Sequence, residues 1–173
     1  MSVFSEYQTD TIDLALDFYG YEDCPKNYEF GPSVRDNFVL HFVTKGKGVF
    51  HFNKKEIHLE AGDLFLLPKN KVTYYKADAE EPWSYYWIGI SGTKVSDFMR
   101  FSTLHEKGFL KKTEVETEKI GQFMERLVHK AEASKMTSHY QLHLLSQIYE
   151  LLFLISEVAP DIHRSHPSPT YQL

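Results

Sequence analysis

The sequence predicts a mainly β fold with α-helices at the C-terminal end, the β part forming a sandwich or barrel. Two observations support this fold class. Between residues 38 and 92, short runs rich in aromatic and β-branched residues alternate with Gly, Asn, Asp or Pro, as they do in all-β domains. After Gly92, apolar residues recur every three or four positions, as on the buried face of a helix.

The first 34 residues are expected to form an N-terminal arm and the first strands. Several aromatic residues, among them Phe18, Tyr19 and Tyr21, lie between turn formers such as Gly20 and Pro25. This mixture favours an ordered segment over a free tail.

The barrel core is expected to span residues 35–92. Its strands are predicted from six successive runs, which are FVLHFV, VFHF, IHL, LFLLP, VTYYKA and WSYYWIGI. Turn-forming residues separate the runs, as in KGKG, NKKE and AGD. Short strands at this regular spacing are typical of a barrel or sandwich.

Residues 93–160 are expected to form a helical region. A short helix is predicted over residues 95–101. A longer helix is expected to begin at a capping box of Thr113 with Glu116, and one apolar row follows this box at helical spacing.

The last helix carries more apolar surface than one packed face requires. It is expected to begin at a second capping box, Ser138 with Gln141, and two neighbouring apolar rows follow. One row can pack on the barrel or on the preceding helix, which leaves the other for a partner chain; the alternative is a hairpin that buries both. The residues expected at a dimer interface are Leu144, Ile148, Leu151, Leu152 and Ile155.

Composition excludes several classes of function. The net charge is −5 and the basic residues are scattered, which argues against nucleic-acid binding by this chain. No apolar run approaches the roughly 18 residues of a membrane span, and no secretory signal is visible, so we expect a cytoplasmic protein without a membrane partner. The single cysteine, Cys24, excludes an internal disulfide and a cysteine-rich metal site.

The run PWSYYWIGISG concentrates large rings on one predicted strand. Because successive side chains on a strand alternate, Trp83, Tyr85 and Trp87 point one way, while Tyr86 and Ile88 point the other. The first three form either a core face or the wall of a pocket. Each of them carries an N–H or O–H group, which favours the pocket, because a dry core is better filled by residues without polar atoms.

The segment around Gly46 has spacings that resemble those of the cupin barrel, a small double-stranded β-barrel or jelly roll. When the segment is aligned on this glycine, the metal-ligand positions of the cupin family fall at Ser33, Arg35, Val39 and Thr73. None of these is a usual ligand for Zn, Fe or Mn, since arginine stays protonated and valine has no donor atom. We therefore expect no metal and no other cofactor.

The same alignment directs a set of polar and aromatic side chains into the barrel. Arg35 and His41 share one face of their strand, and Thr73 shares a face with Tyr75. An interior arginine needs hydrogen-bond acceptors, and a sugar offers hydroxyl groups for the guanidinium and a flat C–H surface for an indole ring. The predicted ligand-binding residues are Arg35, His41, Thr73, Tyr75, Trp83, Tyr85 and Trp87.

Two long segments resemble the N-terminal, effector-binding half of AraC-type transcription regulators, especially regulators of sugar utilisation in Gram-positive bacteria. They are GYEDCPKNYEFGPSVRDNFVLHFVTKGKGVF, residues 20–50, and AGDLFLLPKNKVTYYKADAEEPWSYYWIGISG, residues 61–92. The resemblance implies that Arg35, Tyr75 and Tyr85 bind a sugar and that Trp87 stacks on it. It also implies an N-terminal arm that closes over the ligand.

The resemblance further implies a homodimer held together by the two C-terminal helices. Regulators of this type continue into helix-turn-helix motifs, and nothing in this sequence is similar to those motifs. Residues 161–173 have the composition of a linker, so we expect DNA binding to belong to a domain that this chain lacks. The implied effector is a sugar, such as an α-galactoside or another oligosaccharide.

Two other functions fit the same residues. In a metal-free cupin sugar isomerase or epimerase, His41 would act as the base and a tyrosine as the acid. The sequence lacks a paired carboxylate or a His-Asp arrangement, so we expect that the protein is not an enzyme. A purely structural dimerisation module with a filled barrel is the other alternative.

Overall fold

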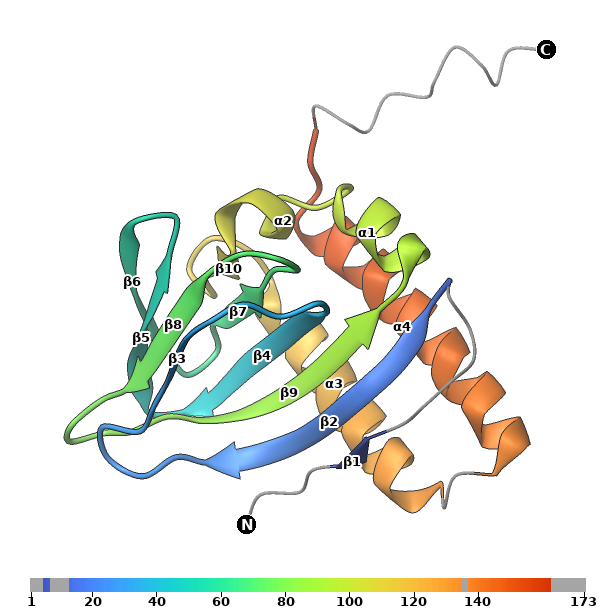
Figure 1. Ribbon diagram of the computed structural model, residues 1–173, viewed down its shortest axis with the longest axis horizontal. Helices are drawn as coiled ribbons and strands as arrows, with labels where there is room; N and C mark the ends of the chain where they lie inside the picture. The colour runs from blue at the N-terminus through green and yellow to red at the C-terminus, as the bar shows by residue number, and fades with distance from the viewer. Residues whose placement is uncertain (1–4, 7–12, 135–136, 163–173) are drawn as a thin grey trace.

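Two antiparallel sheets face one another, and helices cover the outer side of the larger sheet (Figure 1). This arrangement comes from a computed structural model, which describes residues 5–6, 13–134 and 137–162. The sheets form a jelly-roll barrel, so the predicted fold class, mainly β with C-terminal helices, is confirmed. The predicted linker lies almost entirely outside the described residues, as does part of the predicted N-terminal arm.

The larger sheet has six strands in the order β1-β2-β9-β4-β7-β10, with each neighbouring pair antiparallel. The strands are β1 (Ser5–Glu6), β2 (Ala15–Asp23), β9 (Ser84–Ser91), β4 (Phe38–Lys45), β7 (Leu64–Leu67) and β10 (Phe109–Leu110). The smaller sheet has the order β3-β8-β5-β6. Its strands are β3 (Glu29–Ser33), β8 (Thr73–Ala77), β5 (Lys47–Phe52) and β6 (Lys55–Glu60).

The barrel begins earlier in the chain than residue 35, the boundary that the sequence predicts. Strand β2 pairs with β9 over most of its length, and β3 pairs with β8, so both strands are walls of the barrel. Phe18 is buried in the barrel interior, and Tyr19 is buried on the opposite face of the sheet. These two aromatic residues are therefore core residues and not part of a separate arm.

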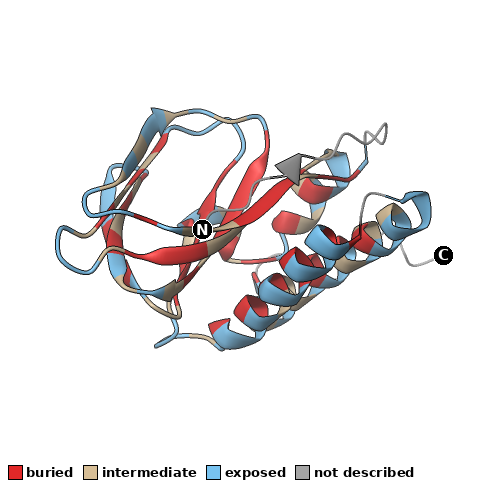
Figure 2. Ribbon diagram, turned by 90° about the horizontal axis from the view of Figure 1, so that it is seen from below, coloured by how far each residue is buried: buried red, intermediate tan, exposed pale blue. Residues whose placement is uncertain are grey.

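Burial on both faces explains why the central strands of the larger sheet have almost continuous apolar sequences. All four residues of β7 are buried, because one face lies against the barrel interior and the other against the helices. Figure 2 shows that buried residues are concentrated in the strands and on the inner sides of the long helices. In the smaller sheet, β6 alternates exposed and buried residues, as expected for a sheet with one face in solvent. The described part of the chain thus has two apolar clusters, one on each side of the larger sheet.

Within the described ranges, four helices follow the barrel. They are α1 (Thr93–Met99), α2 (Leu104–Lys107), α3 (Thr117–Ala133) and α4 (Ser138–Val158). Helices α3 and α4 form a hairpin that lies across the outer face of the larger sheet (Figure 1). Gly121 allows a close approach there, because a side chain at this position would clash with the ring of Phe42 on β4.

Neither predicted capping box is present. Helix α3 begins four residues after Thr113, with Glu116 at the N-cap position and no side-chain cap. Helix α4 has Thr137 at its N-cap position, again without a side-chain hydrogen bond. The start of α3 is fixed by a tertiary contact instead, because the Thr117 hydroxyl donates a hydrogen bond to the Gly62 carbonyl at 2.6 Å.

The five residues predicted at a dimer interface are all buried within their own chain, none more than 4% exposed. They belong to the cluster that packs α4 against α3 and the larger sheet. This prediction is wrong because the outer face of the larger sheet is itself apolar, and these residues of α4 pack against it and against α3. The apolar residues of α4 that stay exposed include Leu142, Tyr149 and Phe153, which form one row along the helix.

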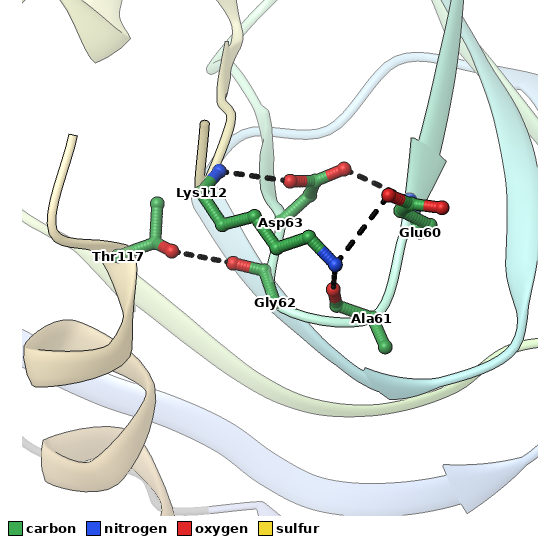
Figure 3. A network of polar contacts seen from close by, with 6 residues as sticks. All are labelled: Glu60, Ala61, Gly62, Asp63, Lys112 and Thr117. Carbon is green, nitrogen blue, oxygen red and sulfur yellow. Dashed lines mark hydrogen bonds and ion pairs between the residues drawn. The ribbon is translucent and has the colours of Figure 1, made fainter. Parts of the chain in front are cut away.

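A polar network joins the turn between β6 and β7 to the segment that leads into α3 (Figure 3). The buried carboxylate of Asp63 accepts hydrogen bonds from the backbone N–H groups of Glu60 and Lys112, both at 2.9 Å. Lys112 in turn donates from its ammonium group to the Ala61 carbonyl at 2.9 Å. The network fixes the barrel relative to the helical hairpin.

We predict that Asp63→Ala lowers the free energy of unfolding by about 1 to 3 kcal/mol, because two part-buried backbone donors lose their acceptor. Urea denaturation of the variant measures this loss. Asp97→Ala, on the exposed face of α1, is the matched control and is expected to change stability by less than about 0.5 kcal/mol. Equal stability of the two variants would contradict the role of the network.

Candidate functional site

The barrel interior brings the sequence-predicted site residues together. Trp83, Tyr85 and Trp87 contact the interior cluster, whereas Tyr86 and Ile88 contact the cluster beneath the helices. The alternation predicted for this strand is therefore confirmed. The rings of His41 and Tyr75 also lie inside, with centroids 5.3 Å apart.

Around Trp83, the interior of the described barrel is packed with aromatic rings. The ring of Phe65 stacks on Trp83 with centroids 5.1 Å apart and on His41 at 4.2 Å. Trp83 is fully buried, and a side chain at Gly48 would collide with its indole ring. Trp83 is thus a core residue, and the interior is not the continuous hollow that its polar residues predict.

The interior is partly open to solvent at the end that holds Trp87 and Arg35. Trp87 and Arg35 are half-buried and lie on the inner side of the barrel, where they are accessible to a ligand. The guanidinium of Arg35 lies over the rings of Phe18 and Phe30, at 5.3 and 5.1 Å from their centroids. These cation–π contacts hold the charge in place without using its hydrogen-bond donors.

Four polar atoms on inward-facing residues are buried and have no hydrogen-bond partner in the part of the chain that the structure describes. They are Ser33 Oγ, Arg35 Nε, His41 Nδ1 and Trp83 Nε1. Buried polar groups are normally satisfied by protein, water or ligand, since each unsatisfied one costs free energy. Ser33 lies directly opposite Thr73, so both side chains border the same space as Arg35 and His41.

The buried side chains of the site are uncharged at neutral pH. Burial lowers the pKa of His41 to about 3, and the nearby positive charge of Arg35 lowers it further. Burial also raises the pKa of Tyr75 and of Tyr85, whose hydroxyl groups interact with one another. The site therefore offers neutral hydrogen-bonding groups beside the single cation of Arg35.

Strands β2 and β3 supply site residues that the sequence analysis missed. Gly20 lies directly opposite Trp87, and Glu22 directly opposite Tyr85, so both face the interior. From β3, Phe30 stacks on Tyr75 with centroids 5.5 Å apart. Alternation along β2 could have revealed these positions, but a bulge between Leu16 and Phe18 shifts its register.

The residues at the cupin metal positions do not fit a metal ion. Arg35 is a permanent cation, Val39 has no donor atom, and Ser33 and Thr73 offer single hydroxyl groups. Among residues 13–134 and 137–162, no group of three or more His, Cys, Asp or Glu side chains could hold an ion. None of the helices in the same ranges is long and apolar enough to cross a membrane.

Fold and site define a cupin-like jelly roll whose open end carries uncharged polar groups, one arginine and aromatic rings. Residues 15–152 match the model of the AraC-like ligand binding domain. The chain belongs to this family.

Two curated relatives are regulators of operons. The Msm operon regulatory protein of Streptococcus mutans is 36% identical over 163 residues, which are 94% of this chain and 58% of that protein. The raffinose operon transcriptional regulatory protein RafR of Pediococcus pentosaceus is 40% identical over 100 residues, 56% of this chain and 36% of the relative. The chain thus spans little more than half the length of the first relative and about a third of the second.

A similar solved structure is that of a cupin superfamily protein from Desulfitobacterium hafniense. The two share 13% sequence identity with a TM-score of 0.40, and the match covers 53% of this chain and 78% of the other.

We predict that His41 makes the protein less stable in acid. Its pKa is about 3 in the folded chain and 6.5 when unperturbed, so the unfolded chain binds the proton first and stability falls as the pH drops below 6.5. Between pH 7 and pH 5 this linkage removes about 2 kcal/mol.

The measurement is urea denaturation of the wild type and of His41→Gln at both pH values. The variant is expected to lose about 2 kcal/mol less than the wild type over this range. His58→Gln, at an exposed position on β6, is the control and should follow the wild type. Identical pH dependence of wild type and His41→Gln would show that the His41 ring is not held neutral by burial.

Proposed function

We propose that this chain is the effector-binding and dimerisation part of a transcription regulator of sugar utilisation, and that it binds a sugar at the open end of the barrel. The observation that carries the proposal is the set of unpartnered polar atoms on Ser33, Arg35 and His41, beside the half-buried indole of Trp87. These groups need a ligand that offers both donors and acceptors.

A sugar meets this need better than an apolar ligand does. Its ring C–H groups can lie on Trp87, next to which Gly20 contributes no side chain. Its hydroxyl groups can accept from the guanidinium of Arg35 and pair with the hydroxyls of Thr73 and Tyr75. The buried hydroxyls and His41 then bind it without a change in protonation at neutral pH.

The names of the relatives support the choice of ligand class. One relative regulates a raffinose operon, and raffinose is an α-galactoside. We therefore propose an α-galactoside or another oligosaccharide as the effector. DNA binding is assigned to the part of the regulator outside this chain, since the relatives are longer than the matched region.

Catalysis as a sugar isomerase or epimerase fits the site less well. A base must hold the abstracted proton near the working pH, and a histidine with a pKa of about 3 gives it up. The raised pKa values of Tyr75 and Tyr85 likewise make them poor acids. These groups suit hydrogen bonding to a bound sugar.

The exposed apolar row on α4 is proposed as the dimer interface. Leu142, Tyr149 and Phe153 are 71, 44 and 58% exposed and lie on one side of a helix of 21 residues. Only two residues of α4, Glu150 and Glu157, carry a full charge. Few charged groups therefore offset its exposed apolar surface, which favours burial against a partner. A second copy of α4 provides a matching row, which a two-fold axis brings into contact.

We predict that Trp87→Ala weakens sugar binding at least tenfold and leaves the fold intact, because the half-exposed indole supports the sugar and little of the core. Isothermal titration calorimetry with raffinose, melibiose and lactose measures the affinity. Tyr74→Ala, on the outer face of β8, is the control and should bind like the wild type. Unchanged affinity of Trp87→Ala would exclude this ring, and turnover of a bound sugar would favour the enzyme.

We predict that the double variant Leu142→Glu, Phe153→Glu is monomeric, because four charges would meet across the two-fold axis. Sedimentation velocity measures the oligomeric state. Ile148→Glu is the contrasting variant: it buries a carboxylate in the chain's own core and is expected to unfold the hairpin. A double variant that still sediments as a dimer would place the interface elsewhere.

A further inference from the structure

Glu22 is a half-buried carboxylate on the inner face of β2 that no other part of the site explains. We infer that Glu22 and Arg35 bind opposite ends of the ligand, and that Glu22 restricts the site to uncharged sugars. This inference rests on the proposed function and adds to it a charge class for the effector.

The register of β2 places Glu22 on the inner side of the barrel. It lies directly opposite Tyr85, whose ring is buried in the interior cluster, and opposed residues of neighbouring strands point to the same face. Glu22 itself is half-buried. Burial is the main cause of the raised pKa of Cys24 and of Tyr28, and the negative charge of nearby Glu22 adds to it.

The carboxylate of Glu22 is unpartnered among the described residues, where no hydrogen bond or ion pair involves it. The next residue shows the contrast. Asp23 points outward and accepts hydrogen bonds from Tyr21 and Ser84, at 2.9 and 2.5 Å. A partly exposed carboxylate without a protein donor is free to accept hydrogen bonds from water or from a ligand.

Glu22 and Arg35 flank the space beside Trp87. Along the inner face of β2 the residues are Phe18, then Gly20, then Glu22, and the guanidinium of Arg35 lies over the Phe18 ring. Four residues of strand span about 13 Å, with the side-chain-free Gly20 in the middle, opposite Trp87. A sugar ring on the indole therefore has an acceptor at one end and a donor at the other.

This arrangement favours uncharged ligands over anionic ones. A neutral sugar donates a hydroxyl proton to Glu22 and accepts from Arg35, so both charged groups are satisfied. A phosphate or carboxylate on the sugar can pair with Arg35, but it then lies in the same partly buried space as Glu22 and is repelled. Without Glu22, the lone cation of Arg35 would favour the anionic ligands.

The test is calorimetric titration of the wild type, Glu22→Gln and Glu22→Asp. The neutral probes are raffinose, melibiose and galactose, and the anionic probes are galactose 6-phosphate and galacturonate. Glu118→Gln, on the exposed side of α3, removes the same charge outside the barrel interior and is the matched control. Thermal unfolding of each variant checks that the fold is retained.

We expect the wild type to bind its best neutral sugar at least tenfold more tightly than either anionic probe. Glu22→Gln should weaken the neutral sugar at least fivefold and tighten the anionic probes at least tenfold. Glu22→Asp should also lose affinity for the neutral sugar but keep rejecting the anions, since it shortens the contact and retains the charge.

Two results would overturn the inference on its own: a Glu22→Gln variant that binds every probe like the wild type, or a wild type that binds the anionic probes as tightly as the neutral ones. In both cases the protein still binds sugars, and the proposed function stands. A wild type that binds none of the five probes would overturn the sugar proposal and this inference together.

Discussion

Burial of the larger sheet on both faces is the constraint on which the rest of this structure depends. Neighbouring residues of β9 contribute to different layers, with Tyr85 and Trp87 inside the barrel and Tyr86 and Ile88 beneath the helices. The strand cannot shift its register without exposing one set and burying the wrong one. The proposed ligand-binding end of the barrel and the helical hairpin are therefore built on the same strand.

This shared strand gives the proposed regulator a short physical route between its two tasks. Tyr86, between Tyr85 and Trp87, reaches α3, where its hydroxyl lies 3.4 Å from Glu125 and its ring 6.0 Å from that of His129. Effector control requires that the sugar bind one arrangement of the dimer better than another. A displacement of β9 by a ligand on Trp87 would be transmitted to α3 across a single residue.

The interior combines a cupin-like barrel with side chains that do not suit a metal ion. At the positions that the cupin resemblance aligns with metal ligands, this chain has Arg35, Val39 and two hydroxyl residues. Aromatic rings around Phe65 fill the space near Trp83. The packed rings form a rigid floor, since each is held by several others. Above that floor, the polar atoms that remain unpartnered define the space in which a ligand can be recognised.

The sequence by itself determined the fold class, six of the strands, and the inward direction of Arg35, His41, Tyr85 and Trp87, because alternation along a strand is a local property. The tertiary structure decided the rest. In the folded chain, the broad apolar face of α4 packs against the chain's own larger sheet. Gly20 and Glu22 on β2 lie directly opposite residues of β9. Such pairings join residues more than sixty positions apart, and no local pattern specifies which strand will lie beside which.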